Sequence, residues 1–146
     1  METRSKEEED LRKLSLELRL LEQTAETLQQ RISMINAAMR DLTLANMTLE
    51  GIEKEKENAE LIVPIGGSSY IKVKLANPDK VIIGMGAGVS IEKTLPEAKA
   101  VVIERRDELQ KSMASAQQQF AQVAQRMNTG RNRLEKLLST AASGKT

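Results

Sequence analysis

The chain carries few of the side chains that perform chemistry in proteins. None of its 146 residues is a Cys or a His, which excludes thiolate or imidazole catalysis and the metal sites that these ligands build. Carboxylates are numerous, but we expect them on exposed helical faces, where charged side chains normally lie in contact with water. The sequence therefore predicts a protein that is not an enzyme and that binds no metal or cofactor.

Two glycine-rich loops invite comparison with nucleotide-binding loops. Residues 84–88 (GMGAG) have part of the glycine spacing of a dinucleotide loop. That fingerprint needs a helix after the glycines, whereas strand-forming residues follow here. Residues 66–69 (GGSS) lack the Lys of a phosphate-binding loop. Both segments are therefore expected to be tight turns.

The composition also argues against nucleic acid and membrane as partners. The net charge is only +1, whereas nucleic-acid binders present a basic face. No apolar run approaches the roughly 20 residues that cross a bilayer, and the first ten residues lack the apolar stretch of a signal peptide. A chain without Cys suits a reducing compartment, so we expect a cytoplasmic protein. The arginines considered for nucleic acid have no interleaved aromatic residues to stack bases; they are Arg105, Arg106, Arg126, Arg131 and Arg133.

Apolar residues recur at alternating steps of three and four through the first and last thirds of the chain. This 3.5-residue period is typical of a helix that packs along one seam of a coiled coil. The two ladders comprise Leu11, Leu14, Leu18, Leu21, Ala25, Leu28, Ile32, Ile35, Met39 and Leu42, and then Val102, Arg106, Leu109, Met113, Ala116, Phe120, Val123, Met127, Gly130, Leu134, Leu137 and Ala141.

The charges of the two helical segments favour pairing within one chain. Residues 1–60 contain fourteen Asp and Glu against nine Lys and Arg, and residues 96–146 contain five against nine. Single surface ion pairs contribute little, but their common sign favours an intramolecular antiparallel hairpin. We expect the acidic run of residues 7–10 to lie near Arg131, Arg133 and Lys136.

The middle of the chain has the pattern of β-strands. Short apolar runs alternate with the turn segments GGSS, Asn77-Pro78-Asp79 and GMGAG, which predicts two tandem β-hairpins. Pro64 cannot donate to a ladder, so its strand should lie at an edge or contain a register break. Thr94 and Glu97 have the spacing of a capping box that opens the second helix.

The expected architecture is a single α+β subunit over residues 1–146, mainly helical. A first helix covers residues 5–60, two hairpins cover 61–94, a second helix covers 95–140, and 141–146 form a frayed tail. Isolated hairpins are marginally stable and their edges invite pairing. The chain is therefore expected to form an oligomer through strands of several chains, in which the residues that need partners are Ile62, Ile65, Ile71, Val73, Val81, Ile83, Val89 and Ile91.

The order of these segments resembles the α-class subunit of prefoldin. The resemblance covers nearly the whole chain, and its specific part is residues 61–95, from VPIGGSSY through the Asn-Pro-Asp turn to IGMGAGVSIEK. Four strands match the α class, since β-class subunits carry a single hairpin. The simple tail and the lack of organelle signals are closer to archaeal than to eukaryotic members.

This resemblance implies a hexamer of two α and four β subunits, whose strands form a double β-barrel platform with six projecting coiled coils. The coil tips would hold unfolded or nascent proteins and pass them to a group II chaperonin without ATP. The platform residues would be Ile62, Val63, Ile65, Tyr70, Ile71, Val73, Leu75, Val81, Ile82, Ile83, Val89 and Ile91. The client-binding tips would be Leu11, Leu14, Leu16, Leu18, Leu20, Leu134, Leu137 and Leu138.

The leucines at the helix ends allow two interpretations. Leu16, Leu20 and Leu138 lie off the seam, and such a surplus of apolar residues at free ends favours a surface that binds other proteins. Alternatively, these leucines widen the packing stripe, or they are singly exposed residues without a function. The methionines on the seam, such as Met39, are expected to fill the core. The rival function is a structural coiled-coil or filament-forming scaffold that holds no clients.

Overall fold

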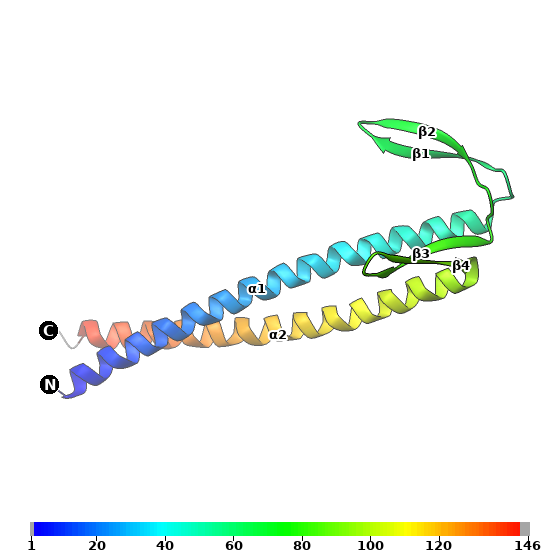
Figure 1. Ribbon diagram of the computed structural model, residues 1–146. Coiled ribbons are helices and arrows are strands. Elements are labelled where there is room, and N and C mark those ends of the chain that lie inside the picture. The colour runs from blue at the N-terminus through cyan, green and yellow to red at the C-terminus, as the bar shows by residue number, and fades with distance from the viewer. Residues whose placement is uncertain (1, 144–146) are drawn as a thin grey trace. The chain divides into compact units, whose positions relative to one another are not determined.

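The computed structural model describes residues 2–143, and it contains two long helices with two β-hairpins between them (Figure 1). This mainly helical α+β fold confirms the fold class expected from the sequence. The elements in chain order are α1 (Glu2–Glu53), β1 (Glu60–Gly66), β2 (Ser69–Lys74), β3 (Lys80–Gly86), β4 (Val89–Thr94) and α2 (Leu95–Ser143).

Helix α2 begins with the capping box that the sequence predicts. The backbone N–H of Glu97 donates to Thr94 Oγ1 at 3.3 Å, and the backbone N–H of Thr94 donates to Glu97 Oε2 at 3.4 Å. Both bonds satisfy donors that a helix start otherwise leaves without partners. The helix continues to Ser143, so residues 141–143, expected in a frayed tail, are helical, and residues 144–146 lie outside the described part of the chain.

Helix α1 ends at Glu53, earlier than the boundary at residue 60 expected from the sequence. Beyond it the backbone changes direction, because Asn58 adopts a left-handed conformation with φ 67°. The N–H of Asn58 donates to the carbonyl of Leu75 at 2.7 Å, and the N–H of Leu75 donates to the carbonyl of Ala59 at 2.9 Å. These bonds hold residues 58 and 59 at the base of the first hairpin, where they cannot extend a helix.

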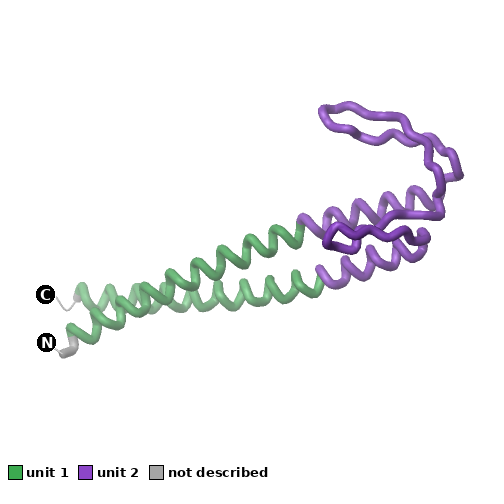
Figure 2. The backbone as a smooth tube through the Cα atoms, viewed as in Figure 1, with its two compact units in different colours: residues 1–36, 110–146 green, residues 37–109 purple. Residues whose placement is uncertain are grey.

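The chain divides into two compact units, which Figure 2 distinguishes by colour. Unit 1 contains residues 1–36 of the N-terminal segment and residues 110–146 of the C-terminal segment, and unit 2 contains residues 37–109. In unit 1 the two helices run antiparallel, since Leu14 and Leu18 lie beside Gly130 while Ala25 lies beside Phe120. Every ladder residue expected on the seam is buried or half-buried, as a coiled coil requires.

Unit 2 has its own small core. It consists of Leu49 from α1, Ile83 from β3, and Leu95, Ala98 and Val102 from α2. Ile52 and Val81 pack against its margin. Lys99 on α2 also forms an ion pair with Glu53 at the end of α1. One hairpin is thereby packed against the helix ends of unit 2.

The two hairpins have the same backbone design. Strand β1 pairs antiparallel with β2 from Glu60↔Lys74 onward, and β3 pairs with β4 from Lys80↔Thr94 onward. Each register shifts just before its turn, between Pro64 and Gly66 in the first hairpin and at the corresponding place in the second. A register break was expected at Pro64, which has no N–H to donate. The same shift at Gly84 shows that the turn produces it without a proline.

Candidate functional site

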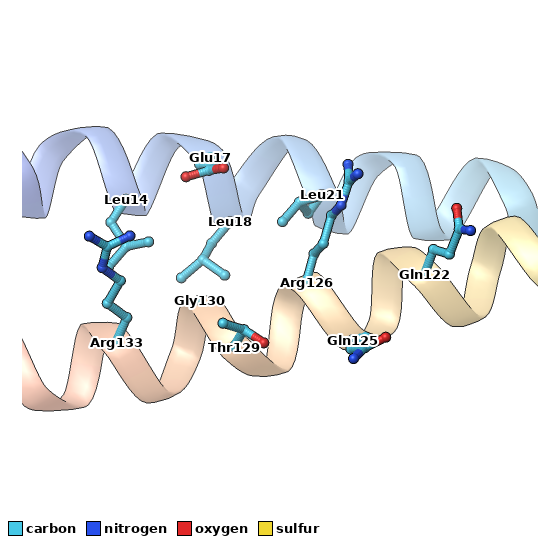
Figure 3. A pocket seen from close by; sticks show the side chains of 10 residues that line it. All are labelled: Leu14, Glu17, Leu18, Leu21, Gln122, Gln125, Arg126, Thr129, Gly130 and Arg133. Atoms are coloured by element: carbon cyan, nitrogen blue, oxygen red, sulfur yellow. The ribbon is translucent and has the colours of Figure 1, made fainter.

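A groove of about 620 Å³ runs along the coiled coil of unit 1 (Figure 3). It is open to solvent and lies between α1 and α2. Its apolar lining comes from α1, and most of its polar lining comes from α2. The lining residues are Leu14, Glu17, Leu18, Leu21, Gln122, Gln125, Arg126, Thr129, Gly130 and Arg133.

A glycine occupies a seam position in the lining of the groove. Gly130 is buried, and a Cβ at this position would lie 2.7 Å from Leu18 Cδ2. Leu18 therefore packs directly on the backbone of α2, as Figure 3 shows. Leu14 and Leu21, one turn to either side of Leu18 on α1, also line the groove. A larger residue in place of Gly130 would clash with Leu18 unless that side chain moved.

Two guanidinium groups border the groove. The side chains of Arg126 and Arg133 extend from α2 toward α1, beside Leu21 and Leu14 respectively (Figure 3). Among the described residues neither arginine forms an ion pair. The one carboxylate in the lining is Glu17. The groove therefore combines an apolar floor with a net positive charge.

Arg131, unlike the two arginines at the groove, forms an ion pair among the described residues. Its Nη2 lies 3.8 Å from Glu22 Oε1, and a smaller hollow beside this pair also contains Glu26 and Phe120. The charge pattern of the sequence predicts that Arg131 lies near the acidic run of residues 7–10. That expectation is wrong for Arg131, because the antiparallel register that sets Gly130 against Leu18 brings Arg131 beside Glu22. Arg133, by contrast, lines one hollow together with Asp10 of the acidic run.

The leucines proposed as tip residues separate into two groups. Leu14 and Leu18 are each 8% exposed and lie in the closed seam, and Leu11, Leu134 and Leu137 are half-buried beside them. Leu16 and Leu20 are 57% and 55% exposed, and Leu138 is 53% exposed. Residues four apart on a helix are neighbours on its surface, so Leu16 and Leu20 make one continuous apolar strip on α1.

The first hairpin presents apolar residues that the chain leaves in contact with solvent. Val63 and Ile71 are cross-strand partners, and they are 40% and 50% exposed. Ile62, Ile65 and Tyr70 are more exposed still, whereas Leu61, Val73 and Leu75 are half-buried. An apolar hairpin of this kind is marginal in water by itself.

The second hairpin differs from the first because one of its faces is buried within the same chain. Ile83 is 8% exposed because it packs against Leu49, Leu95 and Val102 within the same chain, with Val81 at the margin of that core. The expectation that Ile83 needs strands from other chains to be covered is therefore wrong. Ile82, Val89 and Ile91 remain exposed.

An arginine fixes the second hairpin to α2. Arg105 Nη2 donates to the carbonyl oxygen of Gly84 at 2.7 Å and lies 3.9 Å from Met85 Sδ. The sequence pattern draws attention to Arg105 only for nucleic acid and does not reveal this contact, because the partner is a backbone carbonyl on a distant strand. The groove is also absent from the sequence-based expectations, although Gly130 on the seam between Arg126 and Arg133 is a visible signal of it.

Over the described residues, 2–143, no group of three or more carboxylate side chains is arranged to hold a metal ion. Within the same range neither helix has a stretch apolar enough to cross a membrane. The described residues present three surface features, which are the groove of unit 1, the exposed leucines and the exposed apolar residues of the hairpins.

Comparison of the whole sequence with known proteins identifies a family that the chain matches. Residues 21–139 match the family model of prefoldin subunits. The prefoldin subunit alpha of Methanococcoides burtonii is 32% identical over 120 residues, which cover 82% of this chain and 87% of that protein. The prefoldin subunit alpha of Pyrococcus horikoshii is 29% identical over 119 residues, covering 81% and 80% of the two chains.

The fold is also similar to a solved structure. A chain in the cryo-EM structure of the filamentous PFD from Methanocaldococcus jannaschii superimposes with a TM-score of 0.67, covering 77% of this chain and 93% of that one. At 21% sequence identity, this likeness establishes the shared fold alone.

Proposed function

This chain belongs to the prefoldin family, as an α-type subunit, and from this premise we propose that it is part of an ATP-independent holdase. Prefoldins are chaperones and not an enzyme family, and their subunits form oligomeric complexes. In the proposed assembly two α subunits join four β-class subunits in the cytoplasm. The complex captures unfolded or nascent proteins at its coil tips and transfers them to a group II chaperonin.

The exposed strip formed by Leu16 and Leu20, together with Leu138, is the observation that carries this proposal. Other residues form the seam of this coil, so the seam does not need these three leucines for packing. An exposed apolar patch away from a folding core usually marks an interaction site. Leu14 and Leu18 are almost fully buried, so they would offer clients only the small part of each side chain that lines the groove between the helices.

A substitution experiment tests the client-binding role directly. We expect the double change Leu16→Ser and Leu20→Ser to weaken suppression of the aggregation of a chemically unfolded protein. Each leucine contributes about 1–2 kcal/mol to an apolar contact at roughly 25 cal/mol per Å². Either change alone should have a smaller effect, because several coils in one assembly share each client.

The matched control is the double change Leu44→Ser and Met47→Ser. These residues are also exposed apolar residues of α1, but they belong to unit 2. We expect this variant to suppress aggregation as well as the unchanged protein does. Equal loss in both variants would mean that general surface hydrophobicity, and not the tip, is responsible.

A double truncation gives a larger effect. Removing residues 1–20 and 135–146 takes away Leu16, Leu20 and Leu138 together. This change should leave the oligomer assembled, since the hairpins are untouched, and should abolish aggregation suppression. Sedimentation and light scattering measure the two properties separately. A truncated protein that assembles and protects clients fully would place the holding surface elsewhere, at the cavity face of the barrel. An untruncated assembly that does not suppress aggregation would favour the rival function, a coiled-coil or filament-forming scaffold that holds no clients.

A further inference from the structure

The groove beside Gly130 is distinct from the exposed leucine strip and has a different chemistry. Its floor is apolar, formed by Leu14, Leu18 and Leu21. A groove of about 620 Å³ is within the range that accommodates a bound ligand, roughly 300–1,000 Å³. It therefore has room for side chains of an extended peptide segment.

The charges at the groove point to one sign of partner. Arg126 and Arg133 lie at its border without an ion-pair partner among the described residues, and Glu17 supplies a single negative charge. On the other side of the seam, Arg131 is paired with Glu22. Guanidinium groups bind carboxylates through paired N–H donors, so the two open guanidinium groups favour a partner that carries carboxylates.

The groove continues toward the ends of the helices without losing this character. A second hollow shares Leu14, Glu17 and Arg133 with the groove and adds Asp10, Lys13 and Leu137. Asp10 and Lys13 contribute opposite charges, so they leave the balance of the groove unchanged. An extended segment would meet apolar surface along its middle and positive charge at its edges.

We propose that this groove binds extended segments of client proteins in which an apolar side chain is flanked by Asp or Glu. The inference rests on the holdase function proposed above and specifies which client segments the coil prefers. The apolar side chain would contact Leu14, Leu18 and Leu21. The flanking carboxylates would accept hydrogen bonds from Arg126 and Arg133. Segments flanked by Lys or Arg would be disfavoured by like-charge repulsion.

Peptide binding to the full assembly tests this preference. The probes are fluorescent peptides that share one apolar core and carry either Glu or Lys on both flanks, and fluorescence anisotropy gives each Kd. We expect the Glu-flanked peptide to bind about five- to tenfold more tightly, since exposed charge contacts are individually weak. The preference should shrink as salt is added, because the groove is open to solvent.

Charge reversal at the groove supplies the decisive variant. In Arg126→Glu/Arg133→Glu we expect the preference to disappear or reverse, whereas Arg126→Lys/Arg133→Lys should retain most of it. The matched control is Arg12→Glu/Arg19→Glu, which makes the same change in net charge on exposed residues of α1 outside the groove. Circular dichroism verifies helix content, and the neutral variant Arg126→Gln/Arg133→Gln replaces the reversal if the latter unfolds.

Three results would overturn the inference. The first is equal affinity for both peptides in the unchanged protein. The second is the same loss of preference in the control, which would reflect only the overall field of the molecule. The third is a changed assembly mass on charge reversal, which would assign the groove to a contact between subunits. Aggregation suppression is measured in parallel, so a holdase without flank preference is distinguished from a protein that holds no clients.

Discussion

The two β-hairpins have matching backbones but different surroundings. Counting from Glu60 and from Lys80, their registers, shifts and turns coincide position by position. Both turns even use the same run of left-handed residues, Gly66 to Ser68 in one and Gly86 to Gly88 in the other. Yet Ile83 is 8% exposed and Val63, which occupies the corresponding position, is 40% exposed.

The difference arises from the segment that comes after each hairpin in the chain. Strand β4 runs directly into α2, so Ile83 meets the apolar residues Leu95 and Ala98 at the start of that helix. Arg105 adds a hydrogen bond to Gly84, where the first hairpin has Pro64. One hairpin is thus part of the subunit core, while the apolar face of the other is available for strands of other subunits in the proposed assembly.

The largest expected effect is a difference in subunit stability between substitutions at the corresponding residues Ile83 and Val63. Ile83→Asp places a charge in the core of unit 2 without a partner, which should lower the free energy of unfolding by about 3–5 kcal/mol. Helix content should fall as well, because Leu49 and Val102 share that core. Val63→Asp should leave helix content unchanged. Thermal unfolding followed by circular dichroism measures both, and equal losses would contradict the comparison.

The assembly should respond to the first hairpin. Val73→Asp is expected to dissociate the oligomer while helix content stays high, because Val73 lies outside the core that joins the second hairpin to the helices. Lys72→Asp changes charge at the neighbouring exposed position and serves as the control. Analytical ultracentrifugation reads out the mass. A full-sized complex in the Val73 variant would refute the proposed β-platform.

Alanine substitutions at the turn glycines should also affect subunit stability in the second hairpin and oligomer assembly in the first. Gly66 and Gly86 have φ of 106° and 100°, a region that costs a residue with a Cβ on the order of 1–3 kcal/mol. Gly86→Ala should therefore lower the unfolding midpoint of the subunit, and Gly66→Ala should shift dissociation of the oligomer to higher protein concentration. The opposite assignment would mean that the first hairpin carries subunit stability.

The smallest effect concerns the contact that fixes the second hairpin. Arg105→Ala removes one hydrogen bond to Gly84, and a bond of this kind is worth about 1 kcal/mol. Amide hydrogen exchange in β3 and β4 should accelerate by about fivefold, with β1 and β2 unchanged. Lys111→Ala, an exposed change on the same helix, is the control. Faster exchange in both hairpins would show that Arg105 acts on the unit as a whole.

Much of the fold could be predicted because its signals are local. Every residue of the two 3.5-residue ladders is buried or half-buried, although the ladders omit the buried Leu49 and Ala98. The capping box located the start of α2. The end of α1 was misplaced since it depends on hydrogen bonds between residues 58 and 59 and Leu75. The assignment of leucines to client-binding tips and of strand residues to a platform stays a prediction, as both concern molecules outside this chain.

The sequence by itself determined the elements and their order, because periodicity, turn glycines and caps act through neighbours along the chain. It also determined the family, through the turn residues of the two hairpins. Only the tertiary structure decided that Ile83 and not Val63 is buried, and that a groove lies beside Gly130 with Arg126 and Arg133 at its border. Both outcomes depend on which surfaces meet across more than a hundred residues or between a strand and a helix, and no local pattern encodes such a meeting.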